Sequence, residues 1–250
     1  MKRITMTLFF TFLLLIGCAN EKSEEQTIYI AAASDLYHAL TEIGEEFSDE
    51  SGINIEFTYG STGLLTQQIQ EGAPFDLFLA AHESYIDRLI ERDAVFEDSK
   101  AYYAIGRIVT MSSSNEKIEL DKDYLLSSEV QHITIANPEH APYGKAAKET
   151  LESWGIWEDI QPKLVLGENI RQSYQYVESG NADVGIIALA LMNRTEFHYE
   201  LIDEETHEPI LQALGIPVQT EKKELAESLL QFILSERGQE ILIEYGFDIP

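Results

Sequence analysis

The chain has 250 residues, and its 44% hydrophobic content is enough for a substantial core in one large domain or in two of ordinary size. Its 17 Lys and Arg residues are outnumbered by 44 Asp and Glu residues, so the formal net charge is −27. Such an acidic balance argues against nucleic acid or an anionic membrane surface as a binding partner.

The N-terminus has the organisation of a bacterial export signal. Two cationic residues precede an apolar run from Ile4 to Ile16, which is shorter than the roughly 20 residues needed to span a bilayer. The run ends in LIGC, which resembles the lipobox of bacterial lipoproteins, and Cys18 is the only cysteine of the chain. We therefore expect residues 1–17 to be a lipoprotein signal peptide and residues 18–26 to be a lipidated cysteine with a polar tether. A chance cysteine in an ordinary signal is the alternative.

Beyond the tether, apolar runs typical of strands alternate with helical patterns. The expected strands are 27–32, 53–59, 76–80, 103–111, 133–136, 163–166, 183–189 and 213–218. The expected helices lie around 36–47, 61–70, 86–90, 143–154, 170–177, 221–234 and 236–245. This order predicts an α/β fold of two doubly wound units with mostly parallel sheets, in which ligands bind beyond the carboxyl ends of the strands.

The segment GSTGLLTQQIQ, residues 60–70, carries no charged side chain and marks one such position. Ser61 is a typical N-cap residue, but Leu64 stands where a capping box would have Glu or Gln, so no carboxylate covers the helix N-terminus. Similar junctions of small or neutral residues occur at 33–34, 142–144 and 169–170. N–H groups at helix N-termini bind anions, so several converging junctions would hold a compact oxyanion without Lys or Arg. An ordinary capped surface helix is the alternative for Ser61.

Other polar residues suggest rival functions. Ser34, Asp35 and His38 provide a hydroxyl, a carboxylate and a base within one helical turn, but a hydrolase triad seldom arises from such close neighbours. Residues 114–117 (SNEK) match one motif of penicillin-recognising enzymes without its companion motifs. The acidic run 198–208 includes two His residues and could bind a divalent metal, although its confinement to one polar segment favours an exposed loop.

Six stretches resemble, in the same order, the periplasmic or lipoprotein molybdate/tungstate-binding proteins of ABC importers. They are IAAASDL (30–36), GSTGLLTQQIQEGAPFDLFLAA (60–81), IANPEHAPYG (135–144), GENIRQ (167–172), ADVGIIALAL (182–191) and YGF (245–247). The resemblance implies a two-lobed periplasmic-binding-protein type II fold with the ligand cleft between the lobes. It also implies that the lobes close on one tetrahedral oxyanion.

The resemblance carries site residues over to matching positions of this chain. It implies that Ser34 and Ser61 donate their hydroxyl and backbone N–H groups to the anion. It implies backbone N–H donors at Tyr143 and Ile170. Some relatives have a tyrosine phenol as the last donor where this chain has Ala188, so that donor is missing, and whether the Tyr143 phenol replaces it stays open.

Asp35 is a second departure, because a carboxylate facing a bound dianion would repel it, and we expect it to point outward. The resemblance implies a first lobe of residues 27–112 and 208–250 and a second lobe of residues 113–207, with a hinge at the two crossings. It implies an extracytoplasmic, lipid-anchored monomer that delivers molybdate or tungstate to an ABC permease. We expect no enzyme activity, cofactor or metal site. Another oxyanion such as sulfate, or a divalent metal, is the alternative ligand.

Overall fold

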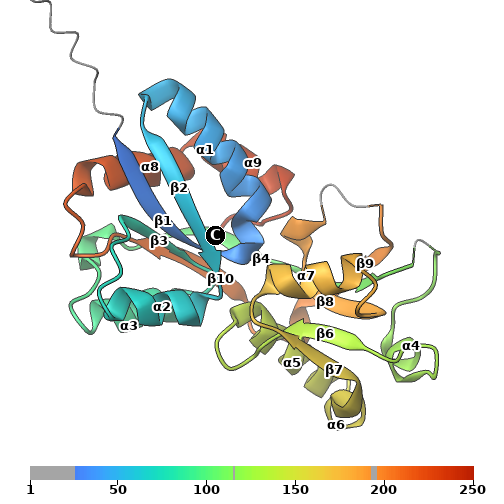
Figure 1. Ribbon diagram of the computed structural model, residues 1–250. Coiled ribbons are helices and arrows are strands. Elements are labelled where there is room, and N and C mark those ends of the chain that lie inside the picture. The colour runs from blue at the N-terminus through green and yellow to red at the C-terminus, as the bar shows by residue number, and fades with distance from the viewer. Residues whose placement is uncertain (1–25, 115, 193–195) are drawn as a thin grey trace, which may run out of the picture.

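Two five-stranded sheets organise the computed structural model, which describes residues 26–114, 116–192 and 196–250 (Figure 1). The first sheet has the strand order β2-β1-β3-β10-β4, and the second has the order β7-β6-β8-β5-β9. The first contains β1 (Thr27–Ala33), β2 (Asn54–Gly60), β3 (Leu77–Ala80), β4 (Ala101–Gly106) and β10 (Ile210–Gly215). The second contains β5 (Ile108–Ser112), β6 (Ile133–Ala136), β7 (Leu164–Gly167), β8 (Val184–Ala188) and β9 (Tyr199–Leu201).

The two sheets share one topology. β1 pairs in parallel with β2 and β3, and β6 pairs in parallel with β7 and β8. β10 in the first sheet and β5 in the second are antiparallel to both of their neighbours. Each of these reversed strands is the first strand after the chain has crossed from the other lobe. The predicted α/β fold with two mostly parallel sheets is confirmed.

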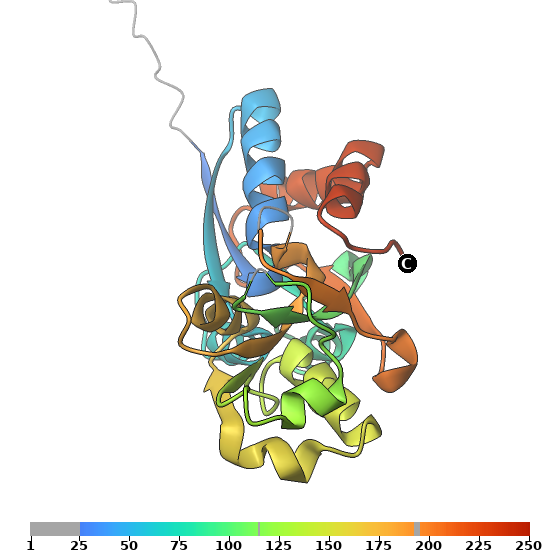
Figure 2. The ribbon, with the colours of Figure 1, turned by 90° about the vertical axis from the view of Figure 1, so that its right-hand side faces the viewer.

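Helices cover both faces of each sheet. In the first lobe these are α1 (Tyr37–Ser51), α2 (Thr62–Gln70), α3 (Glu83–Ile90), α8 (Lys223–Leu234) and α9 (Glu236–Glu244). In the second lobe they are α4 (Lys122–Leu126), α5 (Pro142–Ser153), α6 (Trp157–Ile160) and α7 (Ile170–Glu178). Successive side chains of β1 point to opposite faces of the first sheet, so they belong to two hydrophobic clusters. Ile28 and Ile30 pack in the cluster that includes α1. Ala31 packs in the other cluster, with Leu65 and Ile69 of α2. Figure 2 shows the two termini of the described chain in the same lobe.

The predicted strand 103–111 is wrong, because this segment is two strands in different sheets. β4 ends at Gly106 and β5 begins at Ile108, so the chain crosses between lobes at Arg107, earlier than the expected boundary at 112. β4 is partly buried and β5 is fully buried, and only Gly106 and Arg107 separate their apolar residues, so the sequence pattern predicts one strand. Arg107 is held by ion pairs with Glu204 at 2.7 Å and Asp248 at 3.2 Å.

The second crossing lies between the end of β9 at Leu201 and the start of β10 at Ile210. β9 is a three-residue edge strand inside the polar segment that the sequence predicted as a loop. Its sequence, YEL, lacks a long apolar pattern, and its strand conformation depends on pairing with β5. None of the helices in the described ranges combines the length and apolarity needed to span a membrane.

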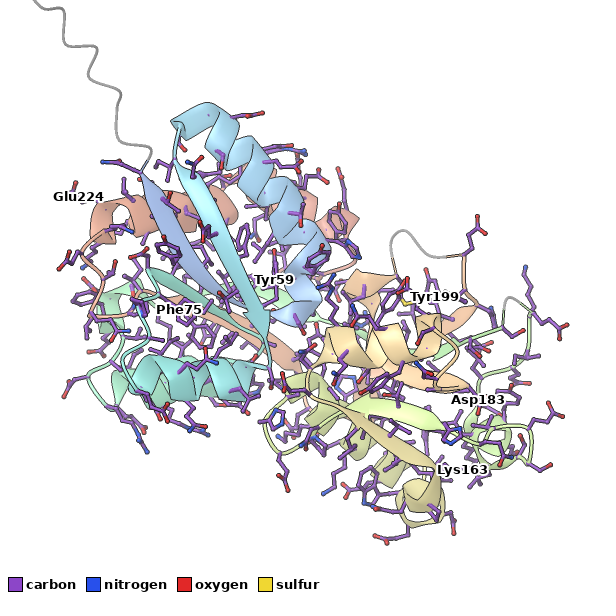
Figure 3. The ribbon with its side chains drawn as sticks, viewed as in Figure 1. Tyr59, Phe75, Lys163, Asp183, Tyr199 and Glu224 are labelled. Carbon is purple, nitrogen blue, oxygen red and sulfur yellow. The ribbon has the colours of Figure 1, made fainter. Side chains whose placement is uncertain are left out.

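The far end of the second lobe is fixed by bonds from side chains to backbone, and Figure 3 labels two of the residues there. Lys163 donates to the carbonyl oxygens of Leu125 at 3.0 Å and Ser127 at 2.7 Å at the end of α4. Asp183 accepts from the N–H group of His132 at 2.8 Å. The Lys163 bonds tie the short α4 to the start of β7, and the Asp183 bond joins the starts of β6 and β8. Both lie at the opposite end of the lobe from the carboxyl ends of β6 and β7.

Candidate functional site

The carboxyl ends of β1, β2, β6 and β7 meet at a small cavity between the lobes. Each strand leads into a helix at this edge: β1 into a 3-10 turn (Ser34–Leu36), β2 into α2, β6 into α5 and β7 into α7. The cavity is lined by Ala33, Ser34, Asp35, Gly60, Ser61, Thr62, Ala81, Ala141, Pro142, Tyr143 and Ile170. The structure therefore brings together the four predicted donor positions, two from each lobe.

Ser61 forms one side of the cavity. It is the N-cap residue of α2, as predicted, and it is only 3% exposed, which is unlike an ordinary surface cap. Its hydroxyl makes no capping bond and instead donates to the carbonyl oxygen of His140 at 2.7 Å, with Nδ1 of the same residue at 2.8 Å. The Gly63 N–H group donates to this carbonyl at 2.9 Å. Because His140 belongs to the second lobe, these bonds hold the two lobes together.

Gly63 allows this close approach of the lobes. A Cβ atom at this position would lie 2.7 Å from the His140 carbonyl oxygen, too close for any other residue without a shift of backbone. The contact of His140 with Ser61 was not predictable from the sequence, since the two residues are far apart in the chain and the loop around His140 has no helical or strand pattern.

Ser34 forms the opposite side and repeats this arrangement. Its hydroxyl donates to Oδ1 of Asn169 at 3.1 Å, and the Arg171 N–H group lies 3.4 Å from its oxygen. Asn169 is the N-cap residue of α7 and accepts from the Gln172 N–H group at 3.0 Å. The Arg171 guanidinium lies over the ring of Tyr37 in α1, 3.5 Å from the centroid. An Asn before a helical pattern is an N-cap signal, so this contact of Asn169 with its helix was recognisable in the sequence, but its contact with Ser34 was not.

Tyr143 and Ile170 place backbone donors on the second lobe's side. Ile170 is the first residue of α7, and Tyr143 follows Pro142 at the start of α5. First-turn N–H groups have no acceptor within their own helix, and the helix dipole adds a partial positive charge there. Gly144 lets α5 begin against β6, because a Cβ atom there would lie 2.1 Å from the Ala136 carbonyl oxygen.

Asp35 does not point outward, and that expectation is wrong. The residue is 1% exposed, and its Oδ2 accepts from Nε2 of Gln212 at 2.7 Å. The same amide nitrogen donates to the Tyr143 phenol at 3.0 Å, while the Tyr103 phenol donates to Oε1 of Gln212 at 2.5 Å. Gln212 is fully buried in β10 and needs polar partners there, so it draws the carboxylate inward. The Tyr143 phenol therefore takes part in a buried network with Asp35 and Gln212.

Burial perturbs the acids of this network. Loss of solvation raises the pKa of Asp35 to about 6, although the Gln212 amide, the Tyr143 phenol and nearby backbone N–H groups oppose the rise. Burial, followed by the charge of Asp35, raises the pKa of Tyr143 well above its ordinary value. The same two causes raise the pKa of Tyr103. Both phenols are therefore protonated at neutral pH, and Asp35 is the group of this network that titrates near it.

The lining contains no Lys or Arg side chain, and its polar residues are Ser34, Asp35, Ser61, Thr62 and Tyr143. Ala188 is not among the lining residues. It pairs with Ile108 at the buried end of β8, and the neighbouring Leu189 N–H group donates to the Arg107 carbonyl oxygen at 2.9 Å, so it lies beside the lobe crossing.

The rival sites do not assemble in the part of the chain that the structure describes. The His38 ring packs against the rings of Tyr37 and Tyr245, with centroids 5.2 Å and 6.4 Å away, while Asp35 turns to Gln212. In the acidic run, Nε2 of His198 lies 2.8 Å from the carbonyl oxygen of Ile118. No group of three or more His, Cys, Asp or Glu side chains in the described ranges is placed to hold a metal ion.

Comparisons with known proteins agree with this architecture. Residues 28–248 match the family of bacterial extracellular solute-binding proteins. The chain is 30% identical to the molybdate-binding protein ModA of Rhodobacter capsulatus, over 94% of this chain and 92% of the relative. It is 30% identical to the putative ABC transporter substrate-binding lipoprotein YvgL of Bacillus subtilis, over 94% of each chain. The solved periplasmic molybdate-binding protein of Azotobacter vinelandii superposes with a TM-score of 0.85 at 26% identity, over 89% of this chain and 99% of that one. The chain therefore belongs to the family of bacterial extracellular solute-binding proteins.

Proposed function

We propose that this protein binds molybdate or tungstate between its lobes and delivers the anion to the permease of an ABC importer. The observation that supports this best is the convergence of four strand-to-helix junctions on one small cavity whose lining includes Ser34 and Ser61, has Asp35 as its one acidic residue and contains no Lys or Arg side chain. Relatives of similar length that are named as molybdate-binding proteins support the choice of anion. The protein acts as a monomer and performs no chemistry on its ligand.

The donors determine which anions fit. Ser34 and Ser61 contribute hydroxyl groups, and Tyr143 and Ile170 contribute first-turn N–H groups, so a tetrahedral anion meets donors from both lobes. A fully deprotonated dianion accepts from all of them, whereas a protonated oxyanion also needs an acceptor for its own O–H group. Donors in a buried cavity are screened much less by salt than exposed charges are, so they dominate over the acidic surface charge.

Binding requires the two serine hydroxyls to exchange partners. In the structure they donate to His140 and Asn169 of the opposite lobe. An anion in the cavity takes over these hydroxyl donors while it bridges the lobes itself. The lobes open for entry and release by rotation about the crossings at Arg107 and at residues 202–209.

Cys18 and the predicted signal and tether, residues 1–26, lie almost entirely outside the described residues, which begin at residue 26. We propose that this cysteine is lipidated and anchors the protein at the extracytoplasmic face of the cell membrane. The LIGC sequence supports this, as does the lipoprotein name of the Bacillus subtilis relative. Radiolabelled palmitate should be incorporated into the wild-type protein in a bacterial host and not into a Cys18→Ala variant.

A thermal-shift experiment on the purified protein tests the ligand. Molybdate, tungstate, sulfate, phosphate and zinc are added separately, because a ligand that binds only the folded state raises the melting temperature. We expect a rise of several degrees with molybdate and tungstate and little change with the other three. A response to sulfate alone would identify another oxyanion as the ligand. A response to zinc alone would favour the metal-binding alternative, and no response to either molybdate or tungstate would refute the proposal.

A further inference from the structure

One carboxyl group in the cavity wall is not used by the proposed binding of the anion. Asp35 lines the same cavity as Ser34 and Ser61, and its side chain is almost fully buried. Its Oδ2 accepts from Gln212. Its Oδ1 is buried without a hydrogen-bond partner among the described residues. A buried polar atom without a partner is costly, so this oxygen needs an explanation.

An ionised Asp35 and a bound dianion are incompatible neighbours. Two negative charges repel strongly where one of them is buried, and a positive charge would be needed between them. The groups that face Asp35 are neutral: the Gln212 amide of β10, the Tyr143 phenol of α5, the Tyr103 phenol of β4 and the backbone N–H groups of Asp35 and Leu36. The guanidinium of Arg171 on α7 lies over Tyr37 and is not part of the cavity lining. These donors reduce the cost of the charged carboxylate but carry no formal positive charge, so a proton is the group that would cancel its charge beside a dianion.

We propose that Asp35 takes up one proton from solvent when the anion binds and donates a hydrogen bond from Oδ1 to an anion oxygen. This inference rests on the proposed oxyanion-binding function. The carboxylate of Asp35 gains one proton and becomes a carboxylic acid, which forms a hydrogen bond to the dianion. No covalent bond of the anion changes. The carboxylic acid supplies a donor that a carboxylate lacks, and Oδ2 continues to accept from Gln212.

The proposal predicts a pH dependence of definite sign. Burial already raises the pKa of Asp35 to about 6 without a bound anion, and the dianion raises it further. Below about pH 6 the carboxyl group of Asp35 is already protonated before the anion binds, so the affinity for the anion does not change with pH. Above about pH 6 the proton must be taken from solvent when the anion binds, so the affinity for the anion falls by up to about tenfold per pH unit.

Titration calorimetry with molybdate, from about pH 5.5 to pH 8.5, tests the proposal on the wild-type protein and on Asp35→Asn. At one pH near 7.5, two buffers of different ionisation enthalpy give the number of protons taken up. We expect close to one proton in the wild type and an affinity that falls as the pH rises. In Asp35→Asn the amide donates at every pH, so we expect no proton uptake, no pH slope and a higher affinity than the wild type at pH 8.5.

His140→Gln is the control, because the His140 side chain is titratable and contacts Ser61 in the cavity without belonging to the Asp35 network. This variant should keep the proton uptake and the pH slope even where its affinity differs. A flat wild-type profile, a slope that persists in Asp35→Asn, or a slope lost only in His140→Gln would each overturn the proposal. Tighter binding of phosphate than of molybdate, without proton uptake, would also overturn it, because an ionised Asp35 would then accept from a protonated anion.

These outcomes are distinguishable from failure of the proposed function. Absence of binding of every oxyanion at every pH refutes the binding function itself, whereas binding without proton uptake refutes only the role of Asp35. If Asp35→Asn does not fold, the number of protons taken up by the wild-type protein, measured in the two buffers, is sufficient to test the proposal.

Discussion

The two lobes face the cavity with different chemistry. The first lobe presents side chains, Ser34 and Ser61 with their hydroxyls and Asp35 with its carboxyl group. The second lobe presents the first turns of α5 and α7, where the donors at Tyr143 and Ile170 are backbone N–H groups. Alanine substitutions therefore remove the hydroxyl donors of the first lobe and leave the backbone N–H groups of Ser34 and Ser61, while the second lobe loses a donor only through a proline. The contributions of the lobes can be measured separately for this reason.

The largest effect is expected from the first lobe. Ser34→Ala and Ser61→Ala should each weaken molybdate binding by roughly 1.5–3 kcal/mol, the range for hydrogen bonds to charged groups. Calorimetry at constant pH measures the loss. Ser228→Ala is a matched control, because this serine is exposed on α8 and its hydroxyl donates within its own helix to the Glu224 carbonyl oxygen at 2.9 Å. Wild-type affinity in both cavity variants would remove these serines from the binding site.

Asp35 should also govern the stability of the protein without its anion. Its pKa is about 6 in the folded state against an ordinary value of 3.8, so its stabilising contribution is complete below about pH 4 and is lost as the pH rises through 6. The shift corresponds to roughly 3 kcal/mol at neutral pH. Asp35→Asn should therefore raise the free energy of unfolding at pH 7.5 and leave a flatter pH profile.

Urea unfolding at pH 5 and pH 7.5 measures this effect. The control is Asp49→Asn, which changes an exposed carboxylate at the end of α1 and should leave the pH profile as in the wild type. An unchanged profile in Asp35→Asn would mean that the carboxyl group is not desolvated in solution.

The second lobe's backbone donor can be tested with proline at Ile170. Proline is well tolerated at the first helical position, and Asn169 before it is already extended, with φ −144° and ψ 171°. Ile170→Pro removes the N–H group and should weaken molybdate binding about tenfold. Ile170→Ala removes the buried side chain but keeps the N–H group, so it should bind more tightly than the proline variant. Equal affinities of the two variants would exclude this N–H group as a donor.

The junctions that form the cavity were predictable because their signals are local. A serine before the apolar stripe of α2 and an asparagine before α7 mark helix starts, and the family resemblance placed the four donor positions at such junctions. The orientation of Asp35 was not predictable, because its partner Gln212 is 177 residues away in an otherwise apolar strand. The crossing at Arg107 was missed for a similar reason, since the pairing partners of β4 and β5 belong to different sheets and the local sequence does not show them.

The smallest effect is expected from a lobe contact outside the cavity lining. The Arg171 guanidinium of α7 lies over Tyr37 of α1, and a cation–π contact at a partly exposed site contributes about 0.5–1 kcal/mol. Arg171→Ala should therefore weaken molybdate binding only about two- to fivefold, through a less stable closed form, and Arg171→Lys should recover part of the loss. A loss as large as that of Ser34→Ala would instead mean that Arg171 contacts the anion. The second lobe would then supply a charged side chain, and the division between side-chain donors in one lobe and backbone donors in the other would be wrong.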